Sequence, residues 1–189
     1  MKLLRHVLLF TLLASVMTPF AAHADRLDIA RLMQLLNAAR EAEVAYTEKK
    51  YSSLLSEPVT SSGTLAFRRP DTVEKNVTTP RKERLRIVGE DLIVLRNGAE
   101  KRIALSSQPL LAAFAASLRG VLAGDVTLLR QYYRLTLEGE EAAWRLQMIP
   151  LEEEILRYVE RITVSGRVGR ILQIEVRESS GDRAVMQMH

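Results

Sequence analysis

The residue types that most enzymes and zinc sites use are scarce in this sequence. There is no cysteine, and of the three histidines only His189, at the carboxyl end, lies beyond the first 24 residues. A Ser/His hydrolase needs a histidine placed inside its domain, and zinc sites draw mainly on Cys and His. A pair of catalytic carboxylates from distant strands would leave no spacing in the sequence, so a glycosidase-like site stays an open alternative. We nevertheless expect no enzymatic activity, no metal and no cofactor.

Two short motifs could bind charged ligands. Glu152-Glu153-Glu154 is the densest carboxylate cluster and offers oxygen ligands of the kind that calcium prefers, but we interpret it as a solvated turn after Pro150. Gly166-Arg167-Val168-Gly169 contains two glycines without a following helical pattern, so it predicts a hairpin turn rather than a phosphate-binding loop. Both motifs favour structure over chemistry.

Arg69 is the charged residue whose position most strongly indicates a specific role. In strict strand alternation it falls on the same side as Leu65 and Phe67, so its guanidinium would point toward an apolar face and need hydrogen-bond acceptors there. Alternatively, the bend at Pro70 turns the side chain to solvent. The pattern leaves both readings open.

The first 24 residues are typical of a secretory signal. A basic start is followed by an apolar stretch from Val7 to Phe20 and the small-residue site Ala22-His23-Ala24, so we expect export to the periplasm with cleavage after Ala24. Cleavage removes two of the 27 basic residues and none of the 23 acidic ones, which leaves 25 against 23 and a formal charge of +2. Without a basic stripe or a second long apolar segment, we expect neither a nucleic-acid partner nor stable membrane insertion.

Residues 25–189 fit a single domain that begins with an amphipathic helix and continues mainly as strands. Apolar residues recur at helical spacing from Leu27 to about Arg40, and the period changes to alternation from Ala42 onward. Asn97-Gly98 is the strongest hairpin signal, because a type I′ turn needs two residues with positive φ. After two strands on either side of the Ser61-Ser62-Gly63 turn, the later strands are predicted at 72–78, 81–88, 91–96, 101–105, 131–138, 142–149, 161–165, 168–177 and 183–188.

One predicted helix interrupts the strands. It starts at Pro109, ends at Gly124 and is apolar over more than half its girth, so it must lie against an apolar surface; a short turn capped by Asp125 follows it. The predicted fold class is therefore mainly β with inserted helices, an incomplete antiparallel barrel of about eleven strands covered by a helical lid. The side chains expected to fill the hollow from this lid are Leu110, Phe114, Leu118 and Leu122.

The sheet should have one apolar face. Leu85 and Ile87, for example, alternate with Arg84 and Arg86. The residues expected to line a cavity for apolar cargo are Leu65, Phe67, Leu85, Ile87, Tyr133, Trp144, Leu146 and Met148. Ordinary core packing is the alternative for any single one of them, and equally for Phe114 in the lid.

Several short segments occur in a characteristic order and spacing along the chain. They are Tyr46–Tyr51, Ser62-Gly63-Thr64-Leu65, Arg69-Pro70, Pro109-Leu110, Leu122–Asp125, Trp144–Leu146 with Pro150, and Ile171–Gly181. Together they resemble the LolA group of periplasmic outer-membrane lipoprotein carriers, in particular its shorter LolA-related members. Two departures are Val73-Glu74, where an aromatic residue is usual, and Glu178-x-x-Gly181 in place of Asp-x-x-Gly.

The resemblance implies a carrier that takes acyl chains of lipoproteins or related lipids from an inner-membrane transporter to an outer-membrane receptor. It also implies that Arg69 latches the lid, donating to carbonyls of the Pro109–Ala123 helix. We expect a monomer. Two rivals stay open: a periplasmic module that senses lipids or porins and regulates a partner, and a carboxylate-dependent hydrolase of envelope glycans or lipids.

Overall fold

The computed structural model describes residues 27–39 and 43–189. The predicted export signal, residues 1–24, lies outside these ranges. Eleven strands form one sheet in which every neighbouring pair is antiparallel. The strands are β1 (Glu43–Tyr51), β2 (Val59–Arg68), β3 (Thr72–Thr79), β4 (Glu83–Val88), β5 (Asp91–Arg96), β6 (Ala99–Ala104), β7 (Tyr133–Glu140), β8 (Ala143–Pro150), β9 (Val159–Arg167), β10 (Arg170–Glu178) and β11 (Arg183–Met188).

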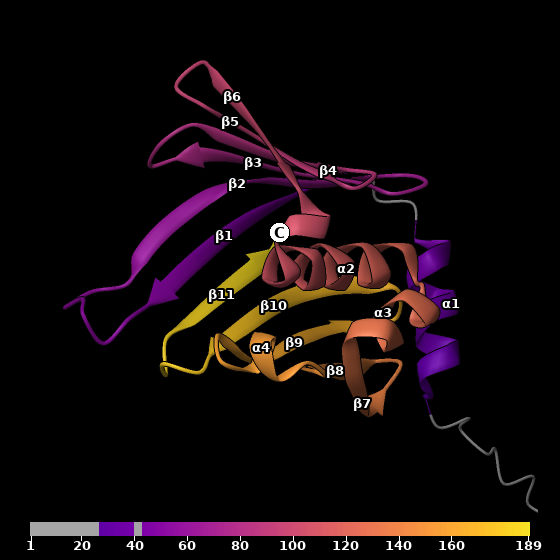
Figure 1. Ribbon diagram of the computed structural model, residues 1–189. Coiled ribbons are helices and arrows are strands. Elements are labelled where there is room, and N and C mark those ends of the chain that lie inside the picture. Colours follow the sequence, from indigo (N-terminus) through magenta and orange to yellow (C-terminus); the bar gives the residue numbers. More distant parts are fainter. Residues whose placement is uncertain (1–26, 40–42) are drawn as a thin grey trace, which may run out of the picture.

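The strand order explains the shape of the sheet. It runs β6-β5-β4-β3-β2-β1-β11-β10-β9-β8-β7, so two meanders are joined where the first strand pairs with the last. The sheet curves around a hollow, but β6 and β7 stay at its two free edges and the barrel is not closed (Figure 1). This confirms the predicted incomplete barrel. The hairpin between β5 and β6 turns at Asn97 and Gly98, whose φ values of 52° and 79° are those that a type I′ turn requires.

The helices begin and end at the predicted signals. Asp28 caps α1 by accepting from the Arg31 amide, and Pro109 opens α2, which ends at Gly124 in the left-handed conformation (φ 68°). Asp125 then caps α3 through the Leu128 amide. The helical elements are α1 (Ile29–Ala38), the 3₁₀ turn η1 (Leu105–Ser107), α2 (Pro109–Ala123), α3 (Val126–Tyr132) and α4 (Glu153–Leu156).

The core lies between the concave face of the sheet and the helices. In Figure 1, α2 runs through the hollow between the two arms of the sheet, while α1 stands at one end of the hollow beside α3. The predicted alternation on β8 is confirmed, because Trp144, Leu146 and Met148 are all buried. The face of α2 that packs inward consists mostly of small residues, which let the helix approach its neighbours closely. Its buried residues are Ala113, Ala115, Ala116, Ser117, Gly120 and Val121.

Several predicted boundaries differ from the structure. The turn expected at Ser61-Ser62-Gly63 is wrong, because these residues lie inside β2. The strand expected from Gln131 starts at Tyr133, because α3 continues to Tyr132 before the chain extends. The expected turn at Glu152–Glu154 is partly helical, since α4 begins at Glu153 and buries Ile155 under the sheet edge. All three glutamates are exposed, as a solvated segment should be.

Candidate functional site

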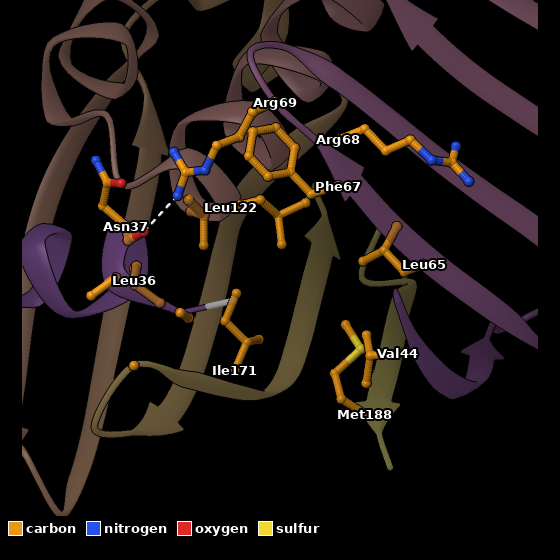
Figure 2. Close-up of a pocket in the computed structure, with 14 residues that line it drawn as sticks. Leu36, Asn37, Val44, Leu65, Phe67, Arg68, Arg69, Leu122, Ile171 and Met188 are labelled. Carbon is orange, nitrogen blue, oxygen red and sulfur yellow. Dashed lines mark hydrogen bonds between the residues drawn. The ribbon is translucent and has the colours of Figure 1, made fainter. Parts of the chain in front are cut away.

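A pocket of about 790 Å³ lies at the end of the hollow where α1 meets the sheet. Among the described residues, six helices and strands (α1, β1, β2, α2, β10 and β11) and the β9–β10 turn contribute to its wall, which combines aliphatic side chains with two arginines at the rim. Figure 2 shows Leu36, Phe67 and Ile171 directed toward the space from different elements. The lining residues are Leu36, Asn37, Ala38, Ala39, Val44, Leu65, Phe67, Arg68, Arg69, Val121, Leu122, Gly169, Ile171 and Met188.

Close backbone contacts hold α1 against its neighbours at this end. A Cβ on Gly124 would collide with the Met33 carbonyl of α1, and one on Gly169 would collide with the Leu35 carbonyl. The two glycines therefore let the end of α2 and the β9–β10 turn approach the backbone of α1. The pocket is the space left between these fixed points and the ends of β2, β10 and β11.

Arg69 reaches across the pocket mouth to α1. One of its terminal nitrogens donates to the Asn37 carbonyl at 2.5 Å, in the last turn of that helix, and its guanidinium lies 5.9 Å from the centre of the Phe67 ring (Figure 2). The residue is exposed while it lines the pocket, so both sequence readings hold in part. The expected acceptor, however, is corrected: the hydrogen bond goes to α1 rather than to a carbonyl of Pro109–Ala123.

A different arginine fastens α2. Arg119 donates through Nε to the Asp71 carbonyl at 2.8 Å and through a terminal nitrogen to the Gly89 carbonyl, which ties the helix to the β2–β3 and β4–β5 turns. From the opposite side, the buried Tyr133 hydroxyl donates to the Ala113 carbonyl at 2.7 Å. Burial raises the pKa of Tyr133 well above its usual value. Neither anchor was predicted, because each joins side chains to backbone carbonyls far away in the sequence.

Beneath its middle, α2 nearly fills the hollow. Two narrow spaces of about 10 and 40 Å³ remain between the helix and the sheet, and Phe114 and Leu118 border both of them. Leu122 borders the smaller space and the large pocket, and Leu110 packs on the core. Phe114 is also 39% exposed, so its side chain covers the hollow while part of it still contacts solvent. The predicted lid residues therefore occupy the concave side in this structure.

The residues predicted to bind cargo divide into two groups. Leu65 and Phe67 line the large pocket, and Met148 borders the smaller space under α2. The remaining residues belong to the core or pack against it without bordering these spaces: Leu85, Ile87, Tyr133, Trp144 and Leu146. Trp144 shows the structural reason, since its indole N–H donates to the Val168 carbonyl at 2.8 Å and its ring lies against Gly166.

Sequence reasoning missed much of the pocket wall. Val44 and Met188 lie together where β1 and β11 pair, and Ile171 and Leu36 face them across the space (Figure 2). Strand alternation identifies Val44 as inward-facing, but it does not reveal that the first and last strands are neighbours. The place of α1 at the end of the hollow is equally non-local.

An ion pair between β1 and β3 lies beside one of the spaces under α2. Lys75 Nζ lies 2.6 Å from Glu48 Oε2 and 5.1 Å from the centre of the Tyr46 ring, and both charged residues border the space of about 40 Å³ under α2. Burial, followed by the charges of Glu48 and Glu83, raises the pKa of Tyr46 to about 12. The apolar pocket and this polar cluster thus lie at different places along the hollow.

Within residues 27–39 and 43–189, no helix combines the length and hydrophobicity needed to cross a membrane. Over the same described residues, no three His, Cys, Asp or Glu side chains are grouped to hold a metal ion. The geometry of the site is instead that of an apolar pocket with polar groups at its rim, the usual form of a small-molecule or lipid site.

The fold and the pocket define a class of protein: an open antiparallel half-barrel whose concave face is covered by helices and leaves an apolar pocket at one end. The chain belongs to the family described as outer membrane lipoprotein carrier protein LolA-like, whose model matches residues 21–187. The family resemblance seen in the sequence is thereby confirmed. A search of curated proteins finds no match.

Several solved structures are similar to the chain at low identity. A LolA superfamily protein from Nitrosomonas europaea is 13% identical with a TM-score of 0.45, covering 85% of this chain and 90% of that one. The lipoprotein LppX of Mycobacterium tuberculosis is 9% identical with a TM-score of 0.42, covering 85% and 92%. The Pseudomonas aeruginosa complex of MucA and MucB is 15% identical with a TM-score of 0.45, covering 86% and 56%. No residue role is transferred from them.

Proposed function

We propose that this protein is a periplasmic carrier that binds acyl chains of lipoproteins or related lipids and ferries them from the inner to the outer membrane. The observation that supports it best is the pocket of about 790 Å³, whose wall is largely aliphatic and continuous with the core. This volume lies in the range of about 300 to 1,000 Å³ typical of ligand sites. Membership of the LolA-like family supports the cargo class.

The packing under α2 suggests how a carrier could release its cargo. Each buried methylene contributes about 0.8 kcal/mol, so a long acyl chain in a preformed hollow would bind very tightly. Here Phe114 and Leu118 already occupy the hollow, and a chain that enters beyond the pocket must displace them. Part of the binding energy would then be used to move α2, which lowers the net affinity to a level that permits transfer.

In this proposal the predicted residues keep separate roles. Leu65, Phe67 and Leu122 contact the cargo in the pocket, and Phe114 and Leu118 act as the cover that yields to a longer chain. Arg69 latches α1 at the pocket mouth instead of latching α2. Delivery by an inner-membrane transporter and receipt by an outer-membrane receptor are part of the proposal, and only the family membership supports them.

Native mass spectrometry of the protein isolated from its own periplasm tests the proposal. We expect a bound acyl-containing mass in the wild type, and its loss in Ile171→Trp, which places an indole in the pocket. Leu172→Trp is the matched control, because this neighbouring residue is exposed and does not line the pocket. A wild type without bound lipid, or an Ile171→Trp variant that keeps it, would contradict the proposal.

Transfer between membranes separates a carrier from a sensor on the same scaffold. A carrier moves labelled lipid or lipoprotein from donor to acceptor vesicles and increases the rate with protein concentration. A regulatory module would bind the lipid without increasing transfer and would co-purify with a signalling protein. Turnover abolished by a single Asp or Glu change would instead favour the hydrolase.

A further inference from the structure

We propose that the pocket selects lipids with an anionic headgroup, which takes the place of the Asn37 carbonyl as the acceptor for Arg69. This inference rests on the proposed function, because it assumes that an acyl chain enters the same pocket. It adds the chemical class of the headgroup, which an apolar wall alone does not determine.

The described residues that line the pocket carry formal charges of one sign only. Among the described residues that line it, two are arginines and none is Asp or Glu. A cationic headgroup would therefore meet the Arg69 guanidinium at the mouth without a carboxylate among the described lining residues, whereas an anionic one would find a positive partner there. The carbonyls at the end of α1 carry a partial negative charge, and Arg69 is the side chain that offsets it at Asn37.

The Arg69 guanidinium can donate further hydrogen bonds. A guanidinium has five N–H groups, and the described part of the chain engages one of them, through the Asn37 carbonyl. The side chain is exposed at the mouth, so the other donors face the solvent from which a headgroup arrives. A phosphate or carboxylate accepts two parallel hydrogen bonds from a guanidinium, and such charge-assisted bonds are about twice as strong as those to a neutral carbonyl.

Arg68 provides an internal comparison. It lines the same pocket, but its guanidinium is directed away from the space, where it lies 3.4 Å from Glu74 (Figure 2). The Arg68 charge is thus already paired on the far side of the strand, while Arg69 points across the mouth. Two neighbouring arginines of equal charge therefore differ in whether they can contact a headgroup.

The exchange has a structural consequence. When the headgroup replaces the Asn37 carbonyl, the last turn of α1 loses its tie to β2, and the carbonyl is left to water. Binding of the correct lipid would then loosen the wall of its own pocket, so that the headgroup as well as the acyl chain contributes to opening.

Competition for a neutral fluorescent probe in the pocket, 1-N-phenylnaphthylamine, measures the preference. The competitors are lysophosphatidylglycerol, lysophosphatidylcholine and monoacylglycerol with one acyl chain, each below its micelle concentration. We expect the anionic lipid to bind about tenfold more tightly than the other two, as one charge-assisted pair would give. Glycerol phosphate and inorganic phosphate, which lack the chain, should not displace the probe.

The variants assign the preference to one side chain. Arg69→Gln should bind all three lipids alike, whereas Arg68→Gln should keep the preference for the anionic lipid. Arg69→Lys should keep part of it, because an ammonium retains the charge without the paired donors. Circular dichroism and binding of the probe itself show that each variant is folded with an intact pocket.

The outcomes separate this inference from the proposed function. Equal affinity for the three headgroups in the wild type, or a preference that survives Arg69→Gln, overturns the headgroup assignment and leaves lipid binding in place. If neither the probe nor any lysolipid binds, the proposed function fails and this inference fails with it.

Discussion

The middle of the hollow and its end are covered in different ways. Under α2 the spaces amount to about 10 and 40 Å³. Arg119 of the helix donates to the carbonyls of two turns, and the Tyr133 hydroxyl of β7 donates to the Ala113 carbonyl of the helix. At the α1 end the pocket measures about 790 Å³, and a single exposed arginine spans its mouth. The cover over the middle is therefore a packed part of the fold, while open space is left at the end, where the proposed ligand would enter.

The largest expected effect is on the free energy of unfolding, and it distinguishes a buried core residue from a residue that lines the pocket. Leu146→Ala should lower the free energy of unfolding by about 3 kcal/mol, because this side chain is 0% exposed and its removal leaves a cavity in the core. Urea unfolding followed by circular dichroism measures the change.

Ile171→Ala is the matched change at the pocket. Its side chain already faces open space, so we expect a loss of about 1 kcal/mol together with weaker probe binding. Equal losses in the two variants would mean that the end of the hollow is as tightly packed in solution as the middle.

An intermediate effect is expected from the anchor of α2. Arg119→Met keeps a long apolar stem but removes both hydrogen bonds to the Asp71 and Gly89 carbonyls, so stability should fall by about 2 kcal/mol. Hydrogen exchange should become faster within Pro109–Ala123.

Arg69→Gln serves as the comparison for this anchor. The residue is exposed, so we expect less than about 1 kcal/mol of lost stability and faster exchange confined to the end of α1. Faster exchange in α2 rather than α1 would show that Arg69 acts on the lid after all.

The smallest effect concerns alkaline pH. The folded pKa of Tyr46 is about 12 against an ordinary 10.0, and burial also raises that of Tyr133. Since the folded protein holds these protons more tightly, the stability from the neutral phenols is complete below pH 10 and is lost as the pH rises through about 12. Urea unfolding between pH 9 and about 12 should show this decline.

Tyr133→Phe tests the contribution of α2 to the alkaline transition. The variant loses the hydrogen bond to Ala113 at neutral pH, but its stability should fall less steeply above pH 10 because one titrating phenol is gone. An unchanged slope would place the pH sensitivity elsewhere in the molecule.

Much of the fold could be read from local patterns. Asn97-Gly98 identified a hairpin because its geometry depends on two adjacent residues, and Pro109 and Gly124 marked both ends of α2 for the same reason. Alternation on β8 correctly placed Trp144 inside, but it did not distinguish a core position from a ligand contact, since both are buried and apolar. Of the residues that line the pocket, the sequence singled out Leu65, Phe67, Arg69 and Leu122.

The sequence by itself determined the approximate positions of most helices and strands, the apolar face of strands such as β8, and the family to which the chain belongs, because these depend on neighbouring residues and their order. Only the tertiary structure decided that β1 pairs with β11, that Arg69 meets Asn37 and that Arg119 fastens α2. These contacts join segments distant in the chain, and their acceptors are backbone carbonyls, which every residue has and no sequence pattern reveals.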